Sequence, residues 1–356
     1  MQKLLVTQCE RQEREMQMRD DLGITTKLEN GKAYLEFALP EKIGRLLSAL
    51  QIEIWEGAEG ERLVFHGEYS SEEADSMTAL LLRPHLWDGM RDPYVYLVKA
   101  QGRFRSVEYG EKMGGMEKEE KLDPAEDITG EVEMYWRQEL TIYDMRVVEK
   151  KGILLNEKEF LPHEVVYRLP PQISDAGTRV EQVRRDLERL VRMGVNAIRL
   201  EGTGSGAERQ NCYEVRAFYR LCRRGGFLTG DLWIRPENLP VYRGLPGETT
   251  CQALLAADGR TLTERYYYYQ AKWSSEPVLY PVLSTLHRQE NGLLSLTIYS
   301  NQKKVVLYVD GVLFLFQSAA SGDPEFIFED IPVAKLPLHL AVEAGNLSIS
   351  LTVSKI

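Results

Sequence analysis

The sequence predicts a multidomain protein of β and α/β class, with a β-sandwich at each end and a parallel α/β segment between them. Short runs of alternating apolar and polar residues fill positions 24–149 and 277–356, which is typical of antiparallel strands with one buried face. Between them strand and helix patterns follow each other in turn. Because single cores stop growing at roughly 250 to 300 residues, a chain of 356 residues should hold several domains. We expect boundaries at 1–149, 150–275 and 276–356.

The first sandwich is predicted from the segments KAYLEFAL, LQIEIW, RLVFHGEY and YVYLVKA, which are separated by turn-forming residues. A hydrophilic stretch around Gly114 holds too few apolar side chains to offset the entropy of ordering, so we expect a mobile loop there. The segments EVEMYW and QELTIYDMRVVE then complete the sandwich near Glu149.

The middle segment reads as two βα units and a final helix. Residues 181–193 place apolar side chains at helical spacing, Gly194 caps this helix, and VNAIRL follows as a buried strand. The charged residues of this helix, Asp186 among them, read as a solvated face. CYEVRAFYRLCRR and FLTGDLW form the second unit. In TLTERYYYYQAKW the aromatics point all round a helix, which indicates packing more than sugar stacking.

The last segment returns to strand alternation in LLSLTIYSN, KVVLYVDGVLF, EFIFEDI, LPLHLAVEA and LSISLTVS, which predicts the second sandwich. A net charge of −10 disfavours nucleic acid as a partner. Because no signal peptide and no long apolar stretch occur, we expect a cytoplasmic protein that does not enter the membrane. Four scattered cysteines without metal-binding spacing predict no metal site, and no organic cofactor signature is present.

Six segments, in a fixed order, resemble glycoside hydrolase family 2, the β-galactosidase and β-glucuronidase family. RPHLWDGMRDPYVYLVKA is similar to the end of its immunoglobulin-like domain, and YDMRVVEKKGILLNEKEFL to the linker and hairpin that open its barrel. DLERLVRMGVNAIRLEG and FYRLCRRGGFLTGDL resemble its second and third barrel units. ERYYYYQAKWSSEPVL is similar to the last barrel helix, and YSNQKKVVLYVDGVLF to a hairpin of the domain that follows.

This resemblance implies an immunoglobulin-like sandwich, a partial (β/α) barrel and a C-terminal immunoglobulin-like sandwich. A complete (β/α)8 barrel needs roughly 250 residues, and the interval from Leu155 to Trp273 is less than half of that. The surviving strands match the first three and the last, which would form a contiguous four-stranded sheet. The family's two catalytic carboxylates sit on the fourth and seventh strands, so the resemblance implies that this barrel remnant has lost them.

The resemblance also marks a vestigial, sugar-facing site with no catalytic residue. Arg199 matches an arginine that supports the family's nucleophile, and we expect it to pair with Glu201 or Asp231. Arg168 takes the place of a histidine on the first strand, and Asp231 keeps the acidic end of the third. The candidate site residues are Arg168, Arg199, Glu201, Asp231 and Trp233.

Three other motifs have structural and functional interpretations. Asn156-Glu157 has the family's acid/base dipeptide, but its position indicates a turn, and His163 is more simply a core or edge histidine. The glycines of GTGSG at 202–206 could cradle a phosphate but lack the full motif, so a flexible loop is simpler.

The hypothesis favoured by the sequence is a non-hydrolytic carbohydrate-binding or subunit-interaction protein. The alternative is an active β-glycosidase with an active site rebuilt from Glu201, Asp231 and Glu237, or shared between subunits. Since a partial barrel leaves two sheet edges open, we also expect a homo-oligomer or a protein partner bound through this region.

Overall fold

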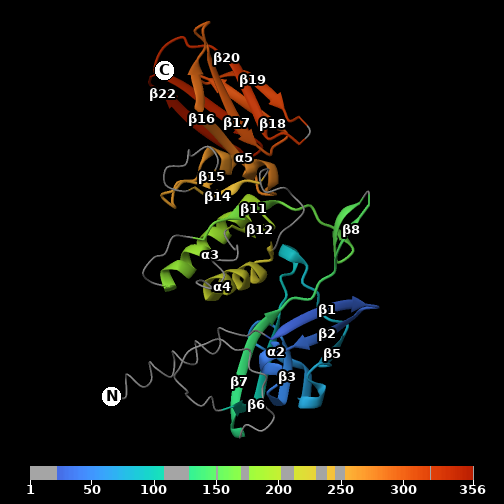
Figure 1. Ribbon diagram of the computed structural model, residues 1–356. Coiled ribbons are helices and arrows are strands. Elements are labelled where there is room, and N and C mark those ends of the chain that lie inside the picture. The colour runs from blue at the N-terminus through green and yellow to red at the C-terminus, as the bar shows by residue number, and fades with distance from the viewer. Residues whose placement is uncertain are drawn as a thin grey trace, which may run out of the picture. The chain divides into compact units, whose positions relative to one another are not determined.

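The computed structural model describes residues 22–107, 128–149, 151–169, 176–201, 212–229, 239–244, 253–320 and 322–355. The chain divides into two compact units, shown in Figure 1. The first is Met1–Phe160 with Cys212–Arg216, and the second is Leu161–Asn211 with Ala217–Ile356. The predicted loop around Gly114 lies outside the described residues.

The first unit contains a sandwich of a three-stranded and a four-stranded antiparallel sheet. The three-stranded sheet has the order β1 (Gly23–Glu29), β2 (Lys32–Ala38), β5 (Thr78–Leu82). The four-stranded sheet has the order β4 (Arg62–Ser70), β3 (Leu47–Glu56), β6 (Tyr96–Val107), β7 (Ile128–Leu140). Three single turns, α2 (Glu41–Gly44), η1 (Ser71–Glu73) and η2 (Gly89–Arg91), lie in the connections.

The core of this sandwich follows directly from the alternation in the sequence. In β2 the side chains of Ala33, Leu35 and Phe37 are buried while their neighbours are exposed. In β3, Leu50 and Ile52 are buried in the same cluster. Because successive side chains of a strand point to opposite faces, each sheet contributes one apolar face to a shared core.

A small antiparallel sheet of β8 (Met145–Val148), β9 (Gly152–Leu155) and β10 (Lys158–Glu159) follows the sandwich. Asn156 and Glu157 both have positive φ, 49° and 66°, in a two-residue turn between β9 and β10. The Asn156 amide donates a hydrogen bond to the backbone oxygen of Trp87, at 2.9 Å. The turn interpretation of this dipeptide is therefore confirmed.

The second unit begins with an open, fully parallel sheet in the described residues. Its order is β13 (Leu228–Thr229), β12 (Ala197–Leu200), β11 (Glu164–Tyr167), β14 (Val241–Arg243), β15 (Ala253–Leu255). The expectation of four strands is therefore wrong, because β14 lies between β11 and the strand that precedes the last helix. The added strand β14 and its neighbour β15 each have three residues, too few to show a period in the sequence.

Three helices accompany this sheet: α3 (Ala176–Met193), α4 (Cys212–Arg224) and α5 (Glu264–Trp273). Tyr167 of β11 bonds to Asp186 of α3 and stacks on Phe218 of α4, so α3 and α4 cover the same face. Gly194 ends α3 with a φ of 88°, as predicted.

The chain itself covers one edge of this sheet. After β15, Leu255 forms an antiparallel bridge with Leu262, and the Thr263 amide donates to the backbone oxygen of Leu254 at 3.0 Å. Asp258 holds the intervening turn by accepting bonds from the amides of Arg260 and Thr261, at 2.8 and 2.9 Å. The β15 edge is therefore not free for a partner strand.

The C-terminal sandwich repeats the strand order of the first. Its sheets are β16 (Leu279–Arg288), β17 (Leu294–Ser300), β20 (Glu325–Ile331), and β19 (Val312–Ser318), β18 (Lys304–Val309), β21 (Leu338–Ala344), β22 (Leu347–Val353). In both sandwiches the first, second and fifth strands form one sheet, and the other four form the second. The predicted fold class is therefore confirmed.

The tyrosines of α5 pack in several directions, as expected. Tyr266 is buried and its hydroxyl donates to the backbone oxygen of Arg189 in α3, at 3.0 Å. Tyr267 stacks on Tyr280 of β16, with ring centroids 3.8 Å apart. No helix of the described residues is long and apolar enough to cross a bilayer.

Candidate functional site

The parallel sheet reverses its strand order between β11 and β14. From β11 the chain proceeds to β12 and β13 on one side, and it later returns to place β14 and β15 on the other. In open parallel sheets, ligands bind beyond the carboxyl ends of the strands at such a point. Arg168 directly follows β11 and Arg243 ends β14, so both lie there. Nη1 of Arg168 donates to the backbone oxygen of Arg243 at 3.2 Å.

Arg168 and Glu201 form an ion pair at the carboxyl ends of β11 and β12. Both Nε and Nη2 of Arg168 donate to the two carboxylate oxygens of Glu201. Such a two-point contact fixes the geometry of both side chains. The Arg168 side chain is 18% exposed and that of Glu201 45% exposed, so solvent reaches this pair. The structure thus brings together two of the predicted site residues.

Arg199 pairs with Glu164. The expected pairing with Glu201 is therefore wrong, and the other expected partner, Asp231, lies outside the described residues. Nε of Arg199 lies 3.1 Å from Oε1 of Glu164, whose side chain is fully buried. The register places Glu164 opposite Ala197, on the sheet face that Arg199 also occupies. Arg199 can therefore reach Glu164 along the sheet, while Arg168 binds Glu201.

The remaining sequence candidates lie outside the described residues. These are Asp231, Trp233, Glu237 and the glycine-rich segment 202–206. Within the described ranges no group of three His, Cys, Asp or Glu side chains could hold a metal ion.

Glu164 and Glu201 are far apart along the sheet. Glu164 is in register with Ala197 of the neighbouring strand β12, and Glu201 lies four residues beyond Ala197 in the same direction. At roughly 3.3 Å per residue, their backbone positions differ by roughly 13 Å along the strands. Retaining glycosidases separate their carboxyl groups by about 5 to 5.5 Å and inverting ones by about 6.5 to 9.5 Å. The positions of these two residues therefore do not suit a hydrolytic pair.

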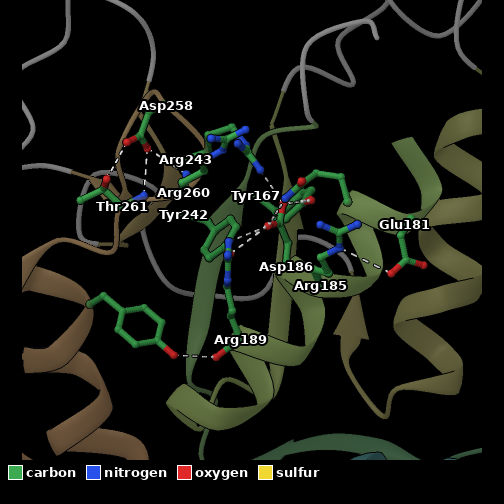
Figure 2. Close-up of polar contacts among 12 residues, drawn as sticks. Tyr167, Glu181, Arg185, Asp186, Arg189, Tyr242, Arg243, Asp258, Arg260 and Thr261 are labelled. Atoms are coloured by element: carbon green, nitrogen blue, oxygen red, sulfur yellow. Dashed lines mark hydrogen bonds and ion pairs between the residues drawn. The ribbon is translucent and has the colours of Figure 1, made fainter. Parts of the chain in front are cut away.

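A buried carboxylate that the sequence did not reveal supports this end of the sheet (Figure 2). Asp186 of α3 is completely buried. It accepts hydrogen bonds from the hydroxyls of Tyr167 and Tyr242 at 2.9 and 3.1 Å, and from Nη2 of Arg243 at 2.6 Å. Gln182 donates a further bond at 3.0 Å. Asp186 thereby ties α3 to the two strands that flank the order reversal.

The environment of Asp186 sets the protonation of its neighbours. Burial, and then the adjacent carboxylate, raises the pKa of Tyr167 well above its ordinary value, and the same two causes raise the pKa of Tyr242. Both hydroxyls therefore stay neutral donors at physiological pH. The guanidinium groups of Arg243, at 2.6 Å, and of Arg189, at 3.5 Å, supply the positive charge that a buried carboxylate requires.

The expected solvated position of Asp186 is thus wrong. A signal was present in the sequence, since Asp186 lies three residues after Val183 and four before Leu190, both of which are buried. Residues at this spacing share one helix face. A carboxylate on an apolar face must find buried donors, but the sequence does not show which ones.

His163 has the structural role that the sequence suggested. Its ring stacks on Trp273 with centroids 5.2 Å apart, and Nδ1 lies 2.9 Å from the backbone oxygen of Gly194. Burial lowers the pKa of this imidazole. His163 thereby packs between the start of β11 and the end of α5.

No protein-family model matches the sequence, and no curated protein matches it. Solved structures do match, at low identity. An FMN-binding beta-glucuronidase from Facaelibacterium prausnitzii L2-6 is 13% identical with a TM-score of 0.63, over 94% of this chain and 74% of that one. A beta-glycosidase from Bacteroides vulgatus is 11% identical with a TM-score of 0.61, over 94% of this chain and 64% of that one.

A glycosyl hydrolase family 2 member from Bacteroides cellulosilyticus DSM 14838 is 13% identical with a TM-score of 0.57, over 94% of this chain. The chain spans 63% of the length of that structure, which is less than two thirds. These similarities show that the fold is of the glycoside hydrolase family 2 type, as the resemblance in the sequence predicted.

Proposed function

We propose that this chain is a non-hydrolytic carbohydrate-binding protein of the glycoside hydrolase family 2 type. The binding region would lie beyond the carboxyl ends of β11, β12 and β14, where the strand order reverses. The observation that carries the proposal is that arginines bind both the acidic residue of β11 and the one that directly follows β12: Arg199 binds Glu164, and Arg168 binds Glu201.

The charge balance of these pairs supports binding without hydrolysis. In both pairs an arginine guanidinium already contacts the carboxylate oxygens that a glycosidase would direct at its substrate. The separation of Glu164 and Glu201 along the sheet is also larger than the distance between the two carboxyl groups of a glycosidase. A guanidinium and a carboxylate in a partly exposed pair can instead donate to and accept from sugar hydroxyls.

The alternative function is a β-glycosidase with a rebuilt or intersubunit active site. The exposure of Glu201 favours it, because a carboxylate open to solvent can reach a substrate. Its catalytic partner would come from Asp231, Glu237 or a second subunit.

Hydrolysis assays separate these two functions. We expect no turnover of p-nitrophenyl β-D-galactoside or β-D-glucuronide above the uncatalysed rate, together with chemical-shift changes in NMR spectra when D-galactose or D-glucuronate is added. Arg168→Ala should reduce those changes. Turnover by the parent chain that disappears in Glu201→Gln would establish the alternative instead.

We further propose that the chain associates through the β13 edge of the parallel sheet. The chain itself covers the β15 edge, and in the described residues β13 pairs only with β12. Unpaired edges favour the addition of another strand. Light scattering at micromolar concentration should give the mass of a dimer, and a monomer at all concentrations would contradict the association.

A further inference from the structure

A hollow of about 460 Å³ lies over the four-stranded sheet of the first sandwich, in the unit that does not contain the parallel sheet. Strands β3, β4 and β6 form it together with the single turn η1, and β3 and β6 can be followed in Figure 1. Its volume falls in the range of roughly 300 to 1,000 Å³ that is usual for small-molecule sites.

The hollow exists because a small residue sits among long polar ones. Ala49 of β3 pairs with Ser70 on one side and with Arg103 on the other. Two residues along the same strand, Gln51 pairs with Glu68 and Gln101. All of these side chains line the hollow. The methyl group of Ala49 therefore forms a floor between two rows of polar side chains.

The polar side chains around Ala49 offer both kinds of hydrogen-bonding group. The Gln51 amide donates and accepts, Arg103 only donates, and Glu68 only accepts. The Gln101 amide nitrogen already donates to the Tyr135 hydroxyl at 3.0 Å, so Gln101 contributes its amide oxygen as an acceptor. The Glu68 side chain is 78% exposed. Within the described residues, Arg103 forms no ion pair. Vicinal hydroxyls of a sugar are themselves both donors and acceptors, so a lining that offers both kinds of group can match them.

One wall of the hollow is held rigid. The Glu73 carboxylate accepts bonds from the backbone amide and the hydroxyl of Ser70, both at 3.0 Å. Both hydrogen bonds lower the pKa of Glu73, the one from the Ser70 backbone amide more than the one from the hydroxyl. This carboxylate is therefore ionised at neutral pH. The lining thus carries two carboxylates, Glu68 and Glu73, and one guanidinium, Arg103. This balance disfavours an anionic ligand.

We propose that the hollow over β3, β4 and β6 binds a neutral sugar unit of a glycan, independently of the parallel sheet. Gln51, Gln101 and Glu68 would bind its hydroxyls above the Ala49 methyl group, and Arg103 would donate from the side. The acidic balance of the lining would select neutral sugars over uronic acids. This site does not depend on the function proposed for the second unit.

Titration of the full chain with lactose, followed by two-dimensional NMR, tests this site. We expect saturable shifts at Gln51 and Gln101, and at least tenfold weaker binding of D-glucuronate at the same residues. Ala49→Leu fills the hollow from an outward-facing position, so it should weaken lactose binding at least tenfold. Arg137→Ala is the matched control, because it removes an arginine from β7 on the same sheet outside the hollow, and it should change affinity less than twofold.

Two outcomes would overturn the site: no lactose shift at Gln51 and Gln101 up to 50 mM, or unchanged lactose binding by Ala49→Leu. The thermal unfolding midpoint of Ala49→Leu verifies that this variant is folded, and Arg103→Ala, which deletes only an exposed side chain, gives a second measurement. Arg168→Ala should leave the lactose shifts at Gln51 intact, which separates this site from the one proposed on the parallel sheet.

Discussion

The two sandwiches and the parallel sheet are stabilised by different means. The core clusters of both sandwiches consist of apolar side chains. The buried charged residues of the described chain, Glu164, Asp186 and Arg243, all belong to the parallel sheet and its helix α3. The sandwiches therefore rely on non-directional burial of apolar surface, whereas the parallel sheet adds specific pairings whose loss leaves a charge without a partner.

This difference teaches which part of the molecule tolerates change. An apolar core accepts many side chains of similar volume, because shape and area decide its stability. A buried ion pair accepts few single replacements, because removal of one partner costs more than the pair contributes. The loss of stability caused by mutations in the two kinds of core should therefore differ in size and in pH dependence. The two kinds of core should also differ in whether a second mutation restores stability.

The largest effect is expected at the Asp186 cluster. Arg243→Met should lower the free energy of unfolding by about 3 kcal/mol, because the buried Asp186 carboxylate loses its partner at 2.6 Å and keeps only the longer ion pair with Arg189, at 3.5 Å. Urea unfolding measures this cost. The double variant Arg243→Met with Asp186→Leu should recover part of the lost stability, since both charges of this pair are then gone. A cost of less than about 1 kcal/mol for Arg243→Met would remove the proposed contrast.

A comparable but simpler effect is expected in the C-terminal sandwich. Leu307 of β18 is completely buried, so Leu307→Ala should cost about 3 kcal/mol through lost burial and a residual cavity. The cost should be the same at pH 5 and pH 8, because no ionisable group is involved. Leu313→Ala on the adjacent strand is the control, since Leu313 is 54% exposed and should change stability by less than about 0.5 kcal/mol. A pH-dependent cost at Leu307 would contradict this account.

The smallest effect is expected from His163. Burial lowers its pKa in the folded chain, so the unfolded chain binds a proton more readily. Stability should therefore fall as the pH drops below about 6.5, by at most about 1.4 kcal/mol per pH unit for a single group. His163→Phe keeps the stacking on Trp273 and should remove this dependence. Unfolding free energies at pH 7 and pH 5 compare the two chains, and identical slopes would show that His163 does not titrate in this range.

The sandwich strands could be predicted from the sequence because alternation reports which face of a strand is buried. The turn at Asn156 was predicted from the resemblance to the family's hairpin, and the packing of the α5 tyrosines from four consecutive aromatic residues on one helix. Strands β14 and β15 were not, because three residues carry no period and only their neighbours in space define them. The partner of Arg199 depends on the register between β11 and β12, and the donors to Asp186 come from strands far away in the sequence.

Helix α5 belongs to two cores at once. On one side Tyr266 contacts α3, and on the other Tyr267 and Tyr268 meet Tyr280 and Tyr299 of the last sandwich. Separation of the parallel sheet from that sandwich would expose several aromatic rings to water, at a cost set by their large apolar area. The helix therefore couples the folding of the parallel sheet to that of the C-terminal sandwich. A destabilising mutation in one should also lower the stability of the other.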